Sequence, residues 1–331
     1  MKNTSMSGLA RVVAAAAVSV LLLAGCSSSG DDAAPSASAT ASASATAPAT
    51  ATAAPSEDTD AALEHPSRIV AVTSETADMA LLLAGPEAMA AVAVGSQSPE
   101  QGMLPDLAGQ VADTLPHGIT PDAEQILSYN PDLVVATIRH GSEQSTADQV
   151  ASAGVQMVEF PSSAFNSPEA YADTLRQMGE LTGYPAKAEK YATEYLDAIT
   201  AIDAQKKGNS PRVLALLFRG GKVMAFSGDN MVPVLAARAG AVDAAADAGI
   251  TATGPIDAEL LVRANPDIIF LEGLREGDKA QFDELLGSPA VADIPAVAGG
   301  KVHLLPSTEA SSIAGINLPV GYQKIMDIIN G

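Results

Sequence analysis

Three arginines and one histidine occupy positions suited to binding an anion or a metal ion. Arg139 and His140 directly follow one apolar run, Arg219 ends a second, and Arg275 follows a third. A guanidinium pairs with carboxylate or catecholate oxygens through charge-assisted hydrogen bonds, and a neutral imidazole is a common metal ligand. The chain is otherwise acidic, with 39 Asp and Glu against 18 Lys and Arg. Arginines at strand ends in such a chain predict an anionic ligand, although each could also be a solvated loop charge.

A duplicated segment indicates which elements position these side chains. In residues 120–135 and 254–270, an apolar face at helical spacing ends at Asn-Pro, and a short apolar run follows. Proline lacks the amide that a continuing helix would need, so each copy predicts a helix and then a strand covered on both faces. Six identities recur at one offset, pairing Asp122 with Asp257, Ala123 with Ala258, Glu124 with Glu259, Asn130 with Asn265, Pro131 with Pro266 and Asp132 with Asp267.

A weaker similarity precedes each copy and extends the repeat. An expected strand at 68–72 leads into an expected helix at 74–85, and 223–226 leads likewise into 229–240. We therefore predict an α/β protein with two similar sandwich lobes, at 63–166 and 208–331. Ligands in this architecture are held by loops at strand ends. The expected loops are 73–76, 96–103, 117–120, 139–143, 219–221, 227–231, 272–276 and 307–312.

The stretch between the lobes, 167–207, predicts two helices. The first begins at Ser167, a residue type that caps helix N-termini, and Gly183 interrupts it. Pro185 starts a longer helix that runs to about residue 206, with an apolar stripe at helical spacing. At 1.5 Å per residue this helix spans about 30 Å, which is long enough to bridge both lobes.

The first 62 residues predict export and a membrane anchor. Lys2 and Arg11 precede an apolar run of residues 12–23, which is too short to span a bilayer and is typical of a signal peptide at 1–25. The run ends in Leu-Ala-Gly-Cys, which resembles a bacterial lipobox, so Cys26 is the expected lipidation site. Residues 26–62 are rich in Ala, Ser, Thr and Pro and predict a disordered tether. We expect a protein held by lipid on the extracytoplasmic face of the cell membrane.

Composition and motifs argue against several other functions. A net charge of −21 makes nucleic acid a poor partner. The chain lacks a Gly-rich phosphate loop, a Gly-x-Ser-x-Gly elbow and a His-Glu-x-x-His helix, so an enzyme is not expected. A receptor for a free metal ion would need several His and carboxylate ligands, and the loops offer only His117 and His140, with Glu272 or Glu309 as carboxylates that could join them. This alternative is less favoured than an iron complex.

The lipobox, the duplicated lobes, the bridging helix and the Asn-Pro-Asp strands together resemble the helical-backbone class of periplasmic binding proteins. The resemblance covers the chain from about residue 68 to residue 331. Members of this family carry haem, ferric siderophores or cobalamin to an ABC permease, and they reach its ATPase through the permease. The resemblance implies a monomer with a ligand cleft between its lobes, little opening motion and no intrinsic cofactor.

The resemblance also implies two contacts with the permease. Family members dock one exposed glutamate from each lobe onto arginines of the permease. The matching positions here are Glu124 and Glu259, at the starts of the two repeated helices. An alternative interpretation is that both are first-turn acids favoured by the helix dipole.

Haem is the ligand that the resemblance favours most. His140 would bind the iron, with Arg139 facing a propionate and with His117, Met103 or Met231 as a second axial ligand. Haem receptors of this family pair the loop histidine with a Tyr-x-Arg, and this chain has Leu217-Phe218-Arg219 there, which lacks the tyrosine. A ferric siderophore or cobalamin is the alternative. The candidate ligand-binding residues are His140, Arg139, Arg219, His117, Met103, Ser227, Met231 and Arg275.

Overall fold

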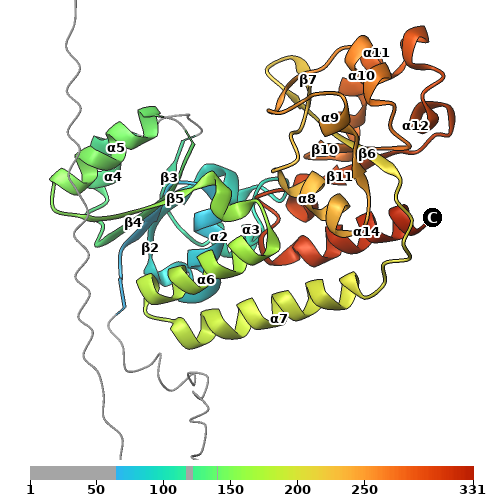
Figure 1. The fold of residues 1–331 in the computed structure, drawn as a ribbon. Coiled ribbons are helices and arrows are strands. Elements are labelled where there is room, and N and C mark those ends of the chain that lie inside the picture. Colours follow the sequence, from blue (N-terminus) through green and yellow to red (C-terminus); the bar gives the residue numbers. More distant parts are fainter. Residues whose placement is uncertain (1–64, 117–121, 140) are drawn as a thin grey trace, which may run out of the picture. The chain divides into compact units, whose positions relative to one another are not determined.

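The structure is a computed structural model that describes residues 65–116, 122–139 and 141–331. The expected signal peptide, Cys26, the tether, His117 and His140 lie outside the described residues. The described chain forms two α/β lobes, each built on its own sheet, as predicted (Figure 1). No helix in this part of the chain has both the length and the apolar character needed to cross a bilayer.

The N-terminal lobe is built on a five-stranded parallel sheet with the order β3-β2-β1-β4-β5. Alternate residues of the central strands face opposite sides of the sheet. Ile69 and Leu133 pack against helices α2 and α6, whereas Val70 and Val134 pack against α4 and α5. The elements are β1 (Ile69–Ala71), α2 (Ser74–Ala84), β2 (Met89–Ala93), α3 (Pro105–Ala108), β3 (Thr114–Leu115), α4 (Ala123–Ser128), β4 (Leu133–Ile138), α5 (Gly141–Ser152), β5 (Gln156–Pro161) and α6 (Pro168–Thr182).

The C-terminal lobe has a six-stranded mixed sheet. Its path is β11-β10-β6-β7-β9, and β8 also pairs with β6. Leu214 and Ile269 pack against one layer of helices, whereas Val213 and Phe270 face a core shared with the N-terminal lobe. The elements are β6 (Arg212–Arg219), β7 (Lys222–Ala225), α8 (Met231–Arg238), β8 (Val242–Asp243), α9 (Ala244–Asp247), β9 (Gly254–Pro255), α10 (Ala258–Ala264), β10 (Ile268–Gly273), η4 (Glu276–Phe282), α11 (Asp283–Leu286), α12 (Pro295–Ala298), β11 (Val302–Pro306), α13 (Ser307–Ala310) and α14 (Leu318–Asn330).

The repeat has the same geometry in both lobes. Asn130 and Asn265 both adopt positive φ, at 47° and 44°, where asparagine is tolerated better than most residues. In each lobe the following aspartate accepts a hydrogen bond from the backbone amide of an arginine at the start of the first strand. Asp132 accepts from Arg68 at 3.1 Å, and Asp267 accepts from Arg212 at 2.8 Å.

The same two arginines close the repeated helices. The Arg68 side chain donates to the carbonyls of residues 129 and 130, and the Arg212 side chain donates to those of residues 264 and 265. These are carbonyls at the helix C-terminus, which have no partner within the helix. Each repeat therefore joins the end of a helix to the amino ends of two neighbouring strands, and we call this arrangement the arginine clamp.

One detail of the expected repeat is wrong. We expected 223–226 to take the place of 68–72, but β7 runs antiparallel to β6 as the second arm of a hairpin. The strand that corresponds to β1 is β6, because it is parallel to β10 as β1 is parallel to β4. The tight turn of this hairpin uses Gly220 and Gly221, both at positive φ, where glycine carries no steric cost. The hairpin carries Arg219 at its tip.

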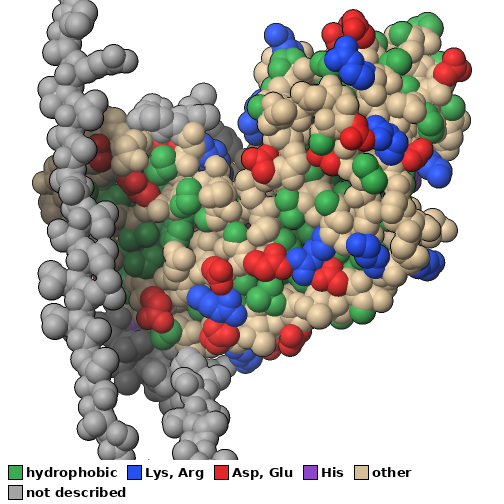
Figure 2. Space-filling model, viewed as in Figure 1, with side chains coloured by type: hydrophobic (Ala, Val, Ile, Leu, Met, Phe, Trp, Pro, Cys, Tyr) green, Lys and Arg blue, Asp and Glu red, His purple; other side chains and the backbone are tan. Residues whose placement is uncertain are grey.

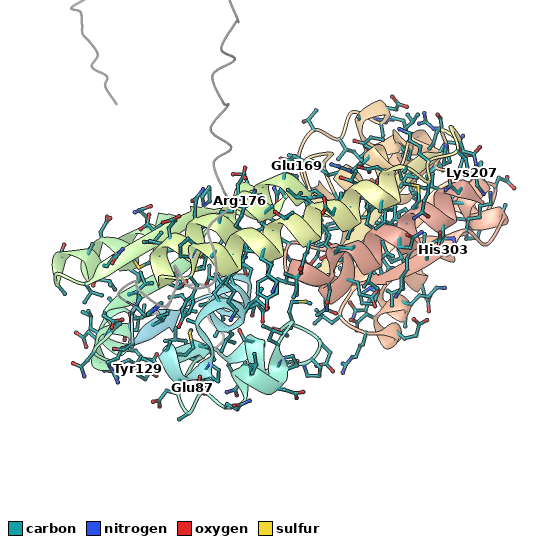
Figure 3. The ribbon with its side chains drawn as sticks, turned by 90° about the horizontal axis from the view of Figure 1, so that it is seen from below. Glu87, Tyr129, Glu169, Arg176, Lys207 and His303 are labelled. Atoms are coloured by element: carbon teal, nitrogen blue, oxygen red, sulfur yellow. The ribbon has the colours of Figure 1, made fainter. Side chains whose placement is uncertain are left out.

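Two antiparallel helices join the lobes. Ser167 caps α6 by accepting a hydrogen bond from the amide of Ala170 at 3.1 Å, and Gly183 ends it at a φ of 81°. Helix α7 (Pro185–Asp203) then runs back alongside α6 and reaches α14 of the C-terminal lobe (Figure 3). Figure 2 shows acidic and basic side chains next to one another along these helices. Arg176 of α6 forms an ion pair with Glu189 of α7 at 2.6 Å.

A partly exposed ionic network holds the end of α7 to the C-terminal lobe. Arg238 of α8 donates to both carboxylate oxygens of Asp203, at 2.7–3.0 Å, and pairs with Glu169 in the first turn of α6. The hydroxyl of Tyr322, on α14, donates to Asp203 at 2.6 Å. Hydrogen bonds to the charged carboxylate outweigh its partial burial and lower the pKa of Asp203. Four helices thus meet at one charged centre.

Candidate functional site

The strand ends of both sheets open onto three adjoining cavities. Their volumes are about 300, 400 and 510 Å³, and all three are lined by Glu272. The 300 and 400 Å³ cavities also share Arg139 and Arg219, one from each lobe. The surface is hollowed between the lobes in the space-filling view (Figure 2). These cavities form one continuous candidate binding site, which we call the interlobe cavity.

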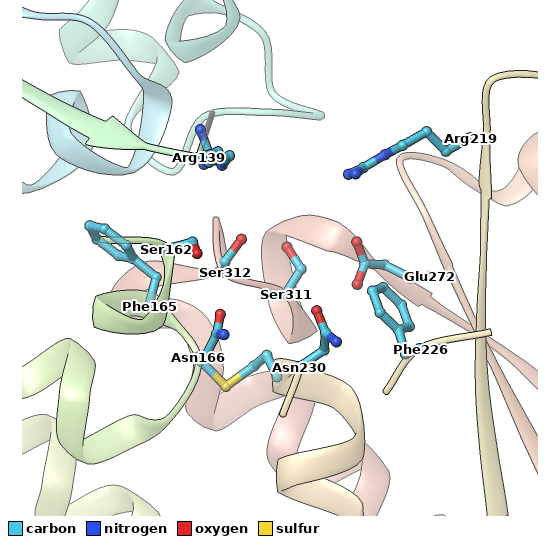
Figure 4. A pocket seen from close by; sticks show the side chains of 11 residues that line it. Arg139, Ser162, Phe165, Asn166, Arg219, Phe226, Asn230, Glu272, Ser311 and Ser312 are labelled. Atoms are coloured by element: carbon cyan, nitrogen blue, oxygen red, sulfur yellow. The ribbon is translucent and has the colours of Figure 1, made fainter. Parts of the chain in front are cut away.

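The lining of its central part is mainly polar. Arg139 follows β4, Arg219 ends β6, and Glu272 lies near the end of β10 (Figure 4). Serine and asparagine side chains surround them, with two phenylalanines and one methionine. The remaining lining residues are Ser162, Phe165, Asn166, Phe226, Asn230, Met231, Ser311 and Ser312.

Arg139 is held by a buried acid. Glu75 lies in the first turn of α2 with its side chain only 4% exposed, and it forms an ion pair with the Arg139 guanidinium. The negative charge of Glu75 is stabilised at this position by the dipole of the α2 N-terminus. The pairing leaves part of the planar guanidinium free to meet a ligand, since Arg139 also lines the cavity.

The C-terminal lobe presents a second arginine and acid. Burial raises the pKa of Glu272 to about 7, although the nearby Arg219 cation and a 3.4 Å hydrogen bond from Ser307 both act to lower it. Ser307 also donates to the carbonyl of Gly273 at 3.1 Å, which fixes its position. The cavity therefore contains a carboxyl group that changes its charge near neutral pH.

A third acid shapes the wall of the cavity. Asp78 of α2 accepts hydrogen bonds from the amides of Met103 and Leu104, at 3.0 and 3.2 Å. Burial is the largest influence on this carboxyl and raises its pKa to about 7. The loop that Asp78 holds contains Gln101, which lines two of the cavities.

The structure brings together only part of the expected ligand set. Arg139, Arg219 and Met231 line the central cavity, and Arg275 lines the 510 Å³ cavity. Ser227 is buried, and its hydroxyl forms hydrogen bonds with the side chains of Asp229 and Thr253, at 2.5 and 3.1 Å. The sulfur of Met103 lies 3.8 Å from the Asn317 side-chain nitrogen. A ligand role for these residues stays a prediction, as it does for His117 and His140.

Several lining residues were not singled out from the sequence. Asn230, Ser311 and Ser312 lie in loops expected to face the ligand, but their types gave no reason to choose them. Glu272 was considered from the sequence only as a carboxylate ligand of a free metal ion. Ser162 and Asn166 lie outside the expected loops altogether, although they follow β5. The strand-end rule, applied to the fifth strand, would have found them. Among the described residues, no group of three or more His, Cys, Asp or Glu could hold a metal ion.

The two expected docking glutamates occupy equivalent positions. Asp122 caps α4 by accepting from the amide of Glu124 at 2.9 Å, and Asp257 caps α10 by accepting from the amide of Leu260 at 2.9 Å. Glu124 is exposed, and the Glu259 side chain is 83% exposed with a 3.2 Å contact to Arg263. The structure thus presents one exposed acid at the same point of each lobe, and docking itself stays a prediction.

Two known binding proteins are similar to this chain in sequence. The ferric-anguibactin-binding protein FatB of Vibrio anguillarum is 24% identical over 249 residues, which are 68% of this chain and 76% of FatB. A vitamin B12-binding protein of Salmonella typhimurium is 32% identical over 95 residues, 29% of this chain and 34% of that protein.

Solved structures show the same fold. The apo form of the periplasmic haem-binding protein RhuT of Roseiflexus sp. RS-1 matches with a TM-score of 0.68 and 24% identity, covering 79% of this chain and 97% of RhuT. The vitamin B12-binding protein BtuF of Vibrio cholerae matches with a TM-score of 0.65 and 17% identity, covering 80% and 96%. The sequence pattern of the family described as periplasmic binding protein matches residues 69–309. The chain belongs to the periplasmic binding protein family.

Proposed function

We propose that this protein is the lipid-anchored, extracytoplasmic receptor of an ABC importer, and that it binds an anionic iron complex in the interlobe cavity. The observation that carries the proposal is that Arg139 and Arg219 reach one cavity from the strand ends of two different lobes. Two cations on opposite walls bind a ligand with acidic groups on both sides. They also make binding depend on both lobes.

Haem is the first ligand to test. Its two propionates match a pair of arginines, and Met231 is a soft iron ligand within the same cavity. The haem-binding RhuT has the same fold, which agrees with this choice.

A ferric siderophore is the second candidate, and the character of the lining favours it. Ser162, Asn166, Asn230, Ser311 and Ser312 offer many hydrogen-bonding groups to an oxygen-rich chelate. Haem would instead bury two large apolar faces, for which the central cavity offers few apolar side chains. FatB, which spans most of this chain, is named for binding a ferric siderophore complex.

A spectroscopic and calorimetric titration of residues 63–331 tests the proposal. Haemin binding would appear as a shifted Soret band, and a ferric siderophore would give a heat of binding without that band. Arg219→Gln should weaken ligand binding at least tenfold, because a charge-assisted hydrogen bond contributes about 1.5–3 kcal/mol to the binding free energy. Arg176→Gln, on the outer helices, is the matched control. Full affinity in Arg219→Gln would contradict the proposed site.

The Arg139 position needs a paired design. Arg139→Gln alone leaves Glu75 buried without its cation, so lost binding could reflect local unfolding. The double variant Arg139→Gln with Glu75→Gln removes both charges and keeps the shapes. We expect it to fold and still to bind at least tenfold more weakly.

Anchoring and docking are tested in cells. Cys26→Ala should release the protein from the membrane, and charge reversal at Glu124 and Glu259 together should abolish uptake while ligand binding stays intact. Unchanged uptake after both reversals would remove the docking proposal.

A further inference from the structure

Glu272 lies where the parts of the interlobe cavity meet. It lines the 300, 400 and 510 Å³ cavities, and Arg219 lines two of them beside it. In the close view, the Arg219 guanidinium extends over the cavity from β6 and the Glu272 carboxyl lies below it (Figure 4). An ionised Glu272 therefore opposes any anion that approaches Arg219.

Other charged groups face the same space from each surrounding element. Arg139 faces it from the position directly after β4, with Glu75 of α2 already paired to it. Arg275 and Asp278 line it from the segment after β10, together with Glu100 from the loop after β2. Glu100 keeps its charge, since a hydrogen bond from Ser98 lowers its pKa.

We propose that Glu272 couples ligand capture to protonation, so that the cavity takes up one proton from solvent at this carboxyl when an anionic ligand binds beside Arg219. This inference rests on the proposed function and adds a specificity rule to it. A protonated Glu272 can donate a hydrogen bond to an oxygen of the ligand and no longer neutralises Arg219. A cationic ligand would instead favour the ionised carboxylate, so Glu272 selects for acidic over cationic cargo.

The charge state of the free protein makes the coupling measurable. Burial places the pKa of Glu272 near 7, so a large fraction of molecules carry the ionised form at neutral pH. An anion beside the carboxyl raises its pKa further. Linkage then requires affinity to fall about tenfold for each pH unit above 7, until the pKa of the complex is reached.

Calorimetry with haemin and with ferric citrate, in two buffers of different ionisation enthalpy at pH 7.5, counts the protons. We expect uptake of up to one proton in the native protein and none in Glu272→Gln, whose amide imitates the protonated form. At pH 8 the variant should bind about tenfold more tightly than the native protein. Glu309→Gln, whose carboxylate pairs with Lys324 instead, is the matched control and should keep the native proton uptake.

A ligand-free measurement separates the two proposals. Carbon-13 NMR of the glutamate carboxyls, with Glu272→Gln for assignment, should show Glu272 titrating near pH 7, and higher in Arg219→Gln. Titration in the ordinary range near 4.5, or binding without proton uptake, overturns the inference even if both probes bind. Failure of both probes to bind at every pH, with Glu272 still titrating near 7, overturns the proposed anionic ligand instead.

Discussion

Asp78→Asn should change how the stability of the protein depends on pH. The Asp78 carboxyl is 5% exposed, and burial raises its pKa from 3.8 to about 7. Between these values the unfolded chain has lost the proton that the folded chain still holds. The free energy of unfolding therefore falls as pH rises from about 4 to 7, and is constant above that range as far as Asp78 is concerned.

The size of the effect follows from the two pKa values. At about 1.4 kcal/mol for each pH unit, the native protein loses about 3 kcal/mol between pH 4.5 and pH 8 through this group. An asparagine does not titrate, so Asp78→Asn lacks this loss. The substitution instead lowers the free energy of unfolding by an amount that does not depend on pH, because the single side-chain oxygen of asparagine can accept a good hydrogen bond from only one of the amides of Met103 and Leu104.

Urea unfolding followed by circular dichroism, at pH 4.5, 6, 7 and 8, measures the difference. The unfolding free energy of Asp78→Asn, relative to the native protein, should rise by about 3 kcal/mol across the series. Asp106→Asn, an exposed acid in the first turn of α3, is the control and should follow the native curve. Parallel curves for Asp78→Asn and the native protein would refute the reasoning, since they would mean that Asp78 titrates alike in both states.

Two further substitutions test the helices that join the lobes. Arg238→Met leaves Asp203 partly buried beside Tyr322 without its cation, and should lower the unfolding free energy by about 2–3 kcal/mol in urea. Arg263→Met, an exposed i,i+4 pair member, should cost under about 0.5 kcal/mol, and equal losses would contradict the network. Gly179→Ala places a methyl group 2.3 Å from a side chain of α7 and should lower the free energy of unfolding by about 1–3 kcal/mol. The methyl group of Gly277→Ala meets no neighbouring atom, so this variant should lose little stability. Thermal melts in which Gly277→Ala is the less stable variant would refute the close packing of α6 on α7.

The sequence predicted the architecture because its evidence was local and repeated. The Asn-Pro-Asp segments mark where a helix ends and a covered strand begins. In the structure, both copies have a helix that ends just before this segment. The helix from Pro185 was recognisable because its apolar stripe, its starting proline and the preceding glycine agree. These features need no knowledge of distant contacts.

The features that were missed depend on distant contacts. The hairpin of β6 and β7 was missed because the apolar pattern of residues 223–226 predicts a strand but does not say whether it pairs parallel or antiparallel with its neighbour. The pairing of Glu75 with Arg139 joins residues 64 positions apart. The raised pKa of Glu272 comes from burial that only the folded lobe creates. Three loop arginines suggested an anion, but the acids beside two of them, Glu75 beside Arg139 and Glu272 beside Arg219, lie far away in the sequence.

The arginine clamps lie at the amino ends of the strands, and the interlobe cavity lies at the carboxyl ends. In each lobe, the strands are thus held in place at the edge of the sheet farthest from the ligand. Loops on the binding rim can change length or chemistry without loosening the fastening, because β1 and β6 are fixed from the other side. Loops at the carboxyl ends of the strands could therefore be redesigned to bind a new ligand, with Arg68 and Arg212 left unchanged.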